Sequence, residues 1–224
     1  VEFGDVGIVL TAGVFLSGFV LAGTMADYKE AERLPGEIAI TLETLEEIFV
    51  LASTGRPALA AGEFKRETLA VADIIKAWLV RARGTAEVFE ALTHMNTVIR
   101  RLEAGGAGPY ASRAVPQLLM LRKNVSRIDV IRRTGFLPPA YALLEVLLVM
   151  ILTLLLAASF KSYVAEFILI PVVTLVNTYM LRLIKDIDDP FDYAPDGAKL
   201  GGAEVDLFPL DEYRARLASR LDVA

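Results

Sequence analysis

The chain contains no cysteine and only one histidine, His94. The lack of cysteine excludes disulfide bonds, thiolate zinc sites and cysteine nucleophiles. His94 has no second histidine to join it in a metal cage, so we interpret it as structural. The glycine run at residues 105–108 is not followed by Gly-Lys-Ser or Gly-Lys-Thr, and so predicts a loop rather than a phosphate cradle. We therefore expect no enzyme and no catalytic residue.

A strong positive charge is also absent, because the formal net charge is −5 and the sequence pI is near 5.1. This balance argues against a nucleic-acid-binding protein. Apolar residues are abundant: 54% of the 224 residues are hydrophobic, although 23% are charged. A soluble domain does not need so much apolar surface, and a simple membrane bundle does not carry so many charges. The apolar residues must therefore be concentrated in particular segments.

The first such segment is Val6–Ala26, which contains 21 residues and no charge. A helix of that length spans about 30 Å, the thickness of the bilayer core. Acidic Glu2 and Asp5 precede it, whereas a signal peptide has a basic region there. The segment therefore predicts a transmembrane helix, and its many small residues suit close helix packing in lipid.

The second apolar segment, Phe136–Leu183, is too long for a single span and is interrupted around Lys161. It predicts two membrane helices, at about Pro139–Phe160 and Val164–Leu183, which form an antiparallel hairpin because their connection is short. Pro171 removes a backbone donor inside the second helix and is expected to kink it.

The region between the apolar segments has helical periodicity throughout, and no stretch alternates as a strand does. We therefore predict an all-α membrane protein with three visible transmembrane helices. The expected organisation is a first transmembrane helix, a helical cytoplasmic domain, a transmembrane hairpin and an acidic cytoplasmic tail, at residues 1–26, 27–135, 136–183 and 184–224. The helices of the cytoplasmic domain are expected at residues 38–52, 69–80, 86–102 and 115–133.

The positive charges predict the orientation in the membrane. Of 23 Lys and Arg residues, 16 lie between Asp27 and Arg133 and six lie from Arg182 onward. The positive-inside rule places these two regions in the cytoplasm, with Lys161 and the amino terminus outside. Because the chain begins at Val1 and a start on the outside is awkward to insert, we expect a further membrane helix upstream.

The acidic stretch at residues 186–192 has two interpretations. It does not fit an EF-hand, because Pro190 and Phe191 occupy key positions and no glutamate closes the loop. A looser oxygen-ligand site for Ca²⁺ that includes Asp186 and Asp189 is one interpretation. The other is a helix end that Pro190 terminates, with Phe191 as an apolar anchor.

Four motifs, taken in order, resemble those of one family. Gly18-Phe19 is followed by Glu30-Ala31-Glu32-Arg33-Leu34-Pro35-Gly36, and later come the stretches at residues 131–141, 187–192 and 207–211. Together they resemble the bestrophin family over nearly the whole chain. The sequence departs from the family pattern at Asp192, where a glycine is usual, and at Pro35, where prokaryotic members often have tryptophan.

The resemblance implies a homopentameric ion channel of four-span subunits in the plasma membrane of a prokaryote. It implies that Val6–Ala26 lines a narrow apolar neck, with Thr11, Phe15 and Phe19 turned toward the pore, and that the cytoplasmic helices form a wider vestibule. Its partners are expected to be membrane lipid and small inorganic ions. Both anion-selective and cation-selective members exist, and we expect an anion such as chloride.

The resemblance also bears on calcium. In this family a calcium clasp surrounds the Pro-Phe motif. Asp186 and Asp189 fall on matching positions, but two later ones fall near Ala194 and Gly197, with only Asp196 close by. Prokaryotic members generally lack the clasp, so we expect no calcium gating and no cofactor.

Two other functions are compatible with the residues alone. A non-conducting membrane scaffold or sensor would bind a partner through its cytoplasmic helices. A transporter would use Glu145, Asn177 and the break at Pro171 as a site in the middle of the membrane.

Overall fold

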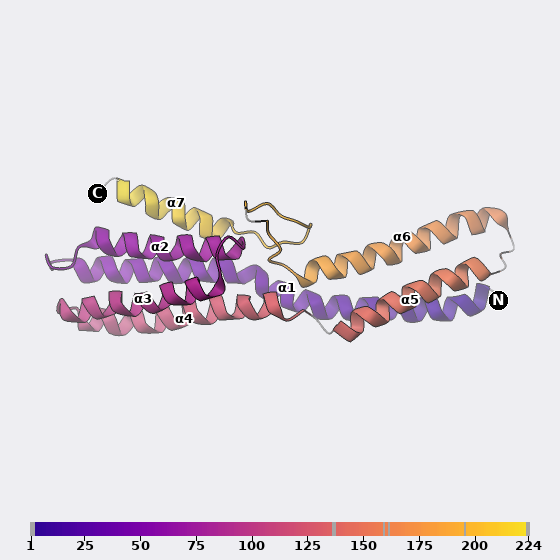
Figure 1. Ribbon diagram of the computed structural model, residues 1–224, viewed down its shortest axis with the longest axis horizontal. Helices are drawn as coiled ribbons and strands as arrows, with labels where there is room; N and C mark the ends of the chain where they lie inside the picture. Colours follow the sequence, from indigo (N-terminus) through magenta and orange to yellow (C-terminus); the bar gives the residue numbers. More distant parts are fainter. Residues whose placement is uncertain (1–2, 136–137, 159, 161, 195, 223–224) are drawn as a thin grey trace. The chain divides into compact units, whose positions relative to one another are not determined.

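The computed structural model describes residues 3–135, 138–158, 160, 162–194 and 196–222, and this part of the chain is almost entirely helical (Figure 1). Within these residues there is no β-strand, only one isolated antiparallel bridge between Tyr193 and Lys199. The predicted all-α class is confirmed. The seven helices of the described residues are α1 (Phe3–Ser53), α2 (Ala61–Leu79), α3 (Thr85–Ala104), α4 (Gly108–Arg133), α5 (Pro138–Ala157), α6 (Tyr163–Asp188) and α7 (Phe208–Asp222).

Three stretches of helix are long and apolar enough to cross a membrane, namely Val6–Ser53, Gly108–Ala157 and Glu166–Asp188. Their apolar parts are the first half of α1, helix α5 and helix α6, as predicted. The chain is therefore an integral membrane protein. Lys161, which we placed outside the membrane, and Phe136, which begins the second apolar segment, lie outside the described residues.

The chain forms two compact units. The membrane unit contains Val1–Lys29 and Thr134–Pro190, and the soluble unit contains Glu30–Arg133 and Phe191–Ala224. Helix α1 contributes to both, because it continues through Pro35 as one helix. We expected separate helices there. Proline removes one backbone hydrogen bond, but Leu34, Pro35 and Ile38 are all buried, and their packing maintains the helix.

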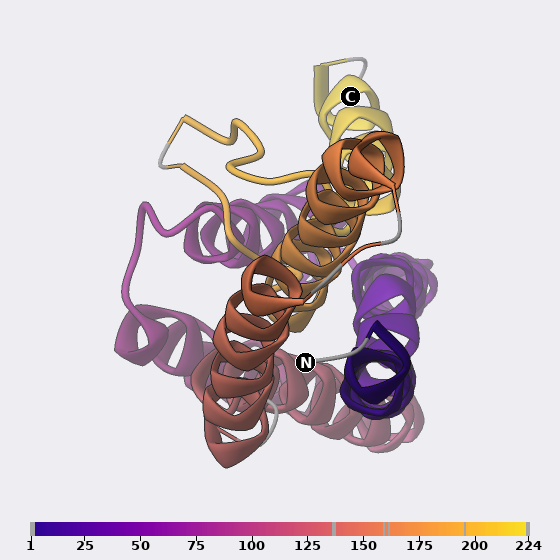
Figure 2. The same cartoon turned by 90° about the vertical axis from the view of Figure 1, so that its right-hand side faces the viewer.

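In the membrane unit, the first half of α1 packs against α5 and α6, which lie side by side (Figure 2). The contact is close at Gly13, where a Cβ atom would lie 2.7 Å from Ile151 Cδ1. Two apolar clusters flank this point, one with Val6, Ile151 and Leu155 and the other with Val20, Leu144 and Ile184.

In the soluble unit, the second half of α1 packs with α2, α3 and α4 around an apolar core. The Phe49 and Phe64 rings stack with centroids 5.3 Å apart. Trp78 is buried, and its indole N–H donates to the Thr85 hydroxyl at 3.1 Å. The largest other core residues include Ile38, Leu42, Leu45, Ile75, Leu79, Leu92, Met95 and Leu102.

Helix α7 lies within the segment that we expected to be an acidic tail. Leu210, Tyr213 and Leu217 are fully buried. Because they recur at i, i+3 and i+7, they form one apolar face, and this face attaches the helix to the rest of the soluble unit.

Candidate pore-lining face and nearby polar clusters

One face of the membrane half of α1 is exposed. The three residues predicted for the neck, Thr11, Phe15 and Phe19, all lie on it, with Phe15 77% and Phe19 64% exposed. They are spaced four residues apart, so they share one side of the helix. The opposite side, with Gly13 and Val20, is buried against α5 and α6.

This exposed face carries almost no polar character. The Thr11 hydroxyl donates to the Gly7 carbonyl oxygen at 2.8 Å, so its hydrogen is occupied within the helix. Ile8, one turn earlier, is 75% exposed and extends the apolar surface. A stripe with two aromatic rings and no charge can contact lipid, another helix or a narrow pore, but offers no group for acid–base or nucleophilic chemistry.

The carboxylates predicted as a loose calcium site lie in both units. Asp186 lies in the last turn of α6 and Asp189 directly follows the helix, both in the membrane unit, whereas Asp196 lies in a loop of the soluble unit. The Asp196 side chain accepts a hydrogen bond from the Ala198 backbone N–H at 3.0 Å. No group of three His, Asp or Glu side chains in the described part of the chain is arranged to hold a metal ion.

The residues considered for a transporter site have partners of their own. Lys185 Nζ donates to Glu145 Oε1 at 2.6 Å, and Asn177 Nδ2 donates to the Val173 carbonyl oxygen at 2.8 Å. The cavity beside Asn177 has a volume of only about 10 Å³. That is about the space that one water molecule needs, so this cavity has no room for a transported substrate.

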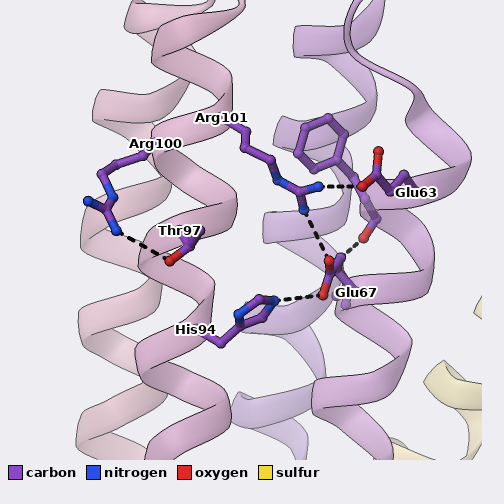
Figure 3. Close-up of polar contacts among 8 residues, drawn as sticks. Glu63, Glu67, His94, Thr97, Arg100 and Arg101 are labelled. Atoms are coloured by element: carbon purple, nitrogen blue, oxygen red, sulfur yellow. Dashed lines mark hydrogen bonds and ion pairs between the residues drawn. The ribbon is translucent and has the colours of Figure 1, made fainter.

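His94 takes part in a surface network between α2 and α3 (Figure 3). Its Nε2 lies 3.2 Å from Glu67 Oε2, and Arg101 pairs with both Glu67 and Glu63. The histidine side chain is 56% exposed, and its contacts are those of a structural residue. The sequence did not indicate its carboxylate partner, because Glu67 lies 27 residues away.

Sequence reasoning missed a second polar cluster, which lies between α1 and α4 in the soluble unit. Glu30, the first residue of the motif at residues 30–36, accepts two hydrogen bonds from Arg127: Nε to Oε1 at 2.8 Å and Nη2 to Oε2 at 2.5 Å. Beside this pair is a cavity of about 460 Å³. The two residues are 97 positions apart, and no local pattern indicates their pairing.

Comparisons with known proteins agree with this architecture. No family model and no curated protein matches the sequence. Among solved structures, a bacterial bestrophin homologue from Klebsiella pneumoniae matches with a TM-score of 0.84 and 14% identity, over 99% of this chain and 88% of that one. A point variant of a bestrophin homologue from the same organism gives a TM-score of 0.81 at 15% identity, with the same coverage.

At this level of identity, the likeness concerns the fold. The structural match over 99% of this chain and 88% of the Klebsiella homologue confirms the fold that the motifs implied. The chain is thus an integral membrane protein with the fold of the bacterial bestrophin homologues.

Proposed function

We propose that this chain is a subunit of a bestrophin-like ion channel that conducts anions such as chloride through an apolar neck. The observation that carries the proposal is the exposed stripe of Thr11, Phe15 and Phe19 on α1, in a chain with the bestrophin fold. In a ring of subunits, these residues would surround the central axis.

The physics of such a neck supports selective conduction. Water leaves a narrow apolar constriction, so an ion there loses solvation, and the constriction acts as a gate. The edges of the Phe15 and Phe19 rings carry partial positive charge, which favours an anion over a cation.

Assembly into an oligomer, a pentamer in our proposal, is supported by exposed apolar residues in the soluble unit. On α4, Val115 and Leu119 are 54% and 67% exposed. On α1, Ile40 and Leu51 are 66% and 53% exposed. Such surface is unfavourable in water, and neighbouring subunits of a ring would cover it.

The proposed location is the plasma membrane of a prokaryote, with the soluble unit in the cytoplasm. The support is the concentration of Lys and Arg residues in the soluble unit, which the positive-inside rule associates with the cytoplasmic side. Calcium gating is not part of the proposal, because two of the positions that match the family's clasp fall near Ala194 and Gly197, which have no side-chain oxygen.

The test is to reconstitute the protein in liposomes and to measure the reversal potential under a chloride gradient. We expect a reversal potential close to the equilibrium potential of chloride. We also expect the protein purified in detergent to have the molecular mass of five chains. Phe15→Ala and Phe19→Ala should each raise the flux, because a wider and less apolar constriction dewets less readily.

The matched control is Phe167→Ala, which removes an equally large ring from α6, where Phe167 is 83% exposed. It should leave the flux unchanged. Flux that does not respond to the two α1 variants would contradict the neck assignment. A monomer or dimer without flux would favour the membrane scaffold instead.

A further inference from the structure

A cavity of about 460 Å³ lies in the soluble unit, whereas the proposed neck face belongs to the membrane unit. Its walls come from residues 30–37 of α1 and residues 120–130 of α4. This volume is within the range of small-molecule sites and far exceeds that of a single water molecule.

The cavity contains a buried polar group without a partner. Asn124 lines it and is only 3% exposed, and its amide nitrogen Nδ2 has no hydrogen-bond partner among the described residues. A buried N–H donor without an acceptor is costly, and natural structures rarely keep one. An oxygen atom of a ligand in the cavity would provide that acceptor.

The charges around the cavity favour an anion. Glu30 is neutralised by its two hydrogen bonds from Arg127. Arg33 and Lys123 also line the cavity. After Arg127, both contribute to lowering the pKa of Glu30, but neither forms an ion pair in the described part of the chain. The remaining carboxylate, Glu37, is outnumbered by these two cations and lies on an exposed helix position.

The rest of the wall is apolar, and this defines the class of anion more closely. Leu34, Met120 and Val130 line the cavity together with the polar residues. An inorganic anion would leave this surface uncovered, whereas an aliphatic tail would cover it. The polar and apolar parts together match a molecule with one carboxylate and a short hydrocarbon chain.

We infer that this cavity binds a small aliphatic monocarboxylate, with the carboxylate at Asn124, Arg33 and Lys123 and the hydrocarbon against Leu34, Met120 and Val130. The inference concerns binding in the soluble unit, so it does not depend on whether the protein conducts ions.

The experiment is calorimetric titration of the full chain in detergent with sodium butyrate, with sodium chloride adjusted to hold the ionic strength constant. We expect saturable binding and an upward shift of the thermal midpoint at saturation. Arg33→Gln and Lys123→Gln should each weaken binding about tenfold, the effect of losing one charge-assisted contact.

Asn124→Leu gives the sharpest result, because leucine has a similar shape and no donor. This variant should fold with an equal or higher thermal midpoint without butyrate, since it removes an unpaired buried group. It should also lose the shift that butyrate causes. The matched controls are Asn96→Leu and Arg100→Gln, two exposed positions on α3, and both should bind butyrate as the wild type does.

Three outcomes would overturn the inference. One is the absence of saturable butyrate binding to the wild-type chain. Another is equal binding by the wild type and by Asn124→Leu. The third is a preference for inorganic phosphate over butyrate, which would show that the apolar wall has no part in binding.

Discussion

Gly13 shows how one residue determines the packing of the membrane unit. The side of α1 that carries it is buried, and the Ile151 side chain of α5 occupies the space where a Cβ would stand. Small residues at such points let membrane helices approach closely, which is the main source of their association in lipid.

Replacing Gly13 with leucine should separate α1 from α5. We expect Gly13→Leu to lower the free energy of unfolding by about 1–3 kcal/mol, the usual cost of overpacking. The thermal midpoint in detergent, followed by circular dichroism, measures this. Gly7→Leu is the control, because no atom outside its own helix backbone lies within 4 Å of a Cβ at that position. Equal midpoints for the two variants would contradict close packing at Gly13.

For single residues, the sequence could predict which side of a helix they share, because that depends on helical periodicity alone. The spacing of Thr11, Phe15 and Phe19 predicts one shared face, and all three lie exposed on the same side of α1. The neck role of that face stays a prediction. The sequence could not indicate that Glu46 is only 4% exposed, because its partner Arg220 on α7 lies 174 positions later along the chain.

Polar contacts attach helix α7 to the second half of α1 in the soluble unit. Arg220 Nη2 donates to Glu46 Oε2 at 2.6 Å, and Arg216 Nη2 donates to Glu43 Oε2 at 3.1 Å. Tyr213 is fully buried, and its hydroxyl lies 3.5 Å from Glu46 Oε2. Burial raises the pKa of Tyr213 well above its ordinary value, and the nearby Glu46 carboxylate raises it further.

The attachment of α7 should therefore weaken in alkali. A folded pKa above the unfolded value means that the contribution of Tyr213 is complete below about pH 10 and is lost as the pH rises further. We expect the thermal midpoint of the wild type to fall more between about pH 9 and 11 than that of Tyr213→Phe. Because other tyrosines and lysines titrate in both proteins, the difference between them isolates this residue. Parallel curves would contradict the prediction.

Helix boundaries could be predicted to different extents. The helices at residues 86–102 and 139–160 agree with α3 and α5 to within a few residues, because the first has a long apolar periodicity and the second is one long apolar run. Helix α7 was missed, although Leu210, Tyr213 and Leu217 recur at helical spacing. This apolar pattern is short, and the acidic residues around it made the segment resemble a solvated tail.

For the whole molecule, composition and run length were enough to predict three spans and an all-helical soluble part. The number of spans follows from the length of each apolar run compared with the thickness of the bilayer, and the helices follow from the spacing of apolar residues. Both can be read from a short stretch of sequence. The cavity between α1 and α4 could not be predicted, because Asn124 and Arg33 meet only through tertiary packing. A cavity is a property of that packing, and no segment of the sequence carries it alone.

The exposed stripe on α1 has a consequence for thiol chemistry. Since the chain has no cysteine, a single Phe15→Cys or Thr11→Cys substitution introduces the only reactive sulfur. A thiolate forms in water and not in hydrocarbon, so a charged methanethiosulfonate reagent modifies a wetted position and leaves a lipid-covered one intact. Val20→Cys places the sulfur on the packed side of α1 and serves as the reference that is not labelled. Labelling at positions 11 and 15 but not at 20 would trace an aqueous path along the helix.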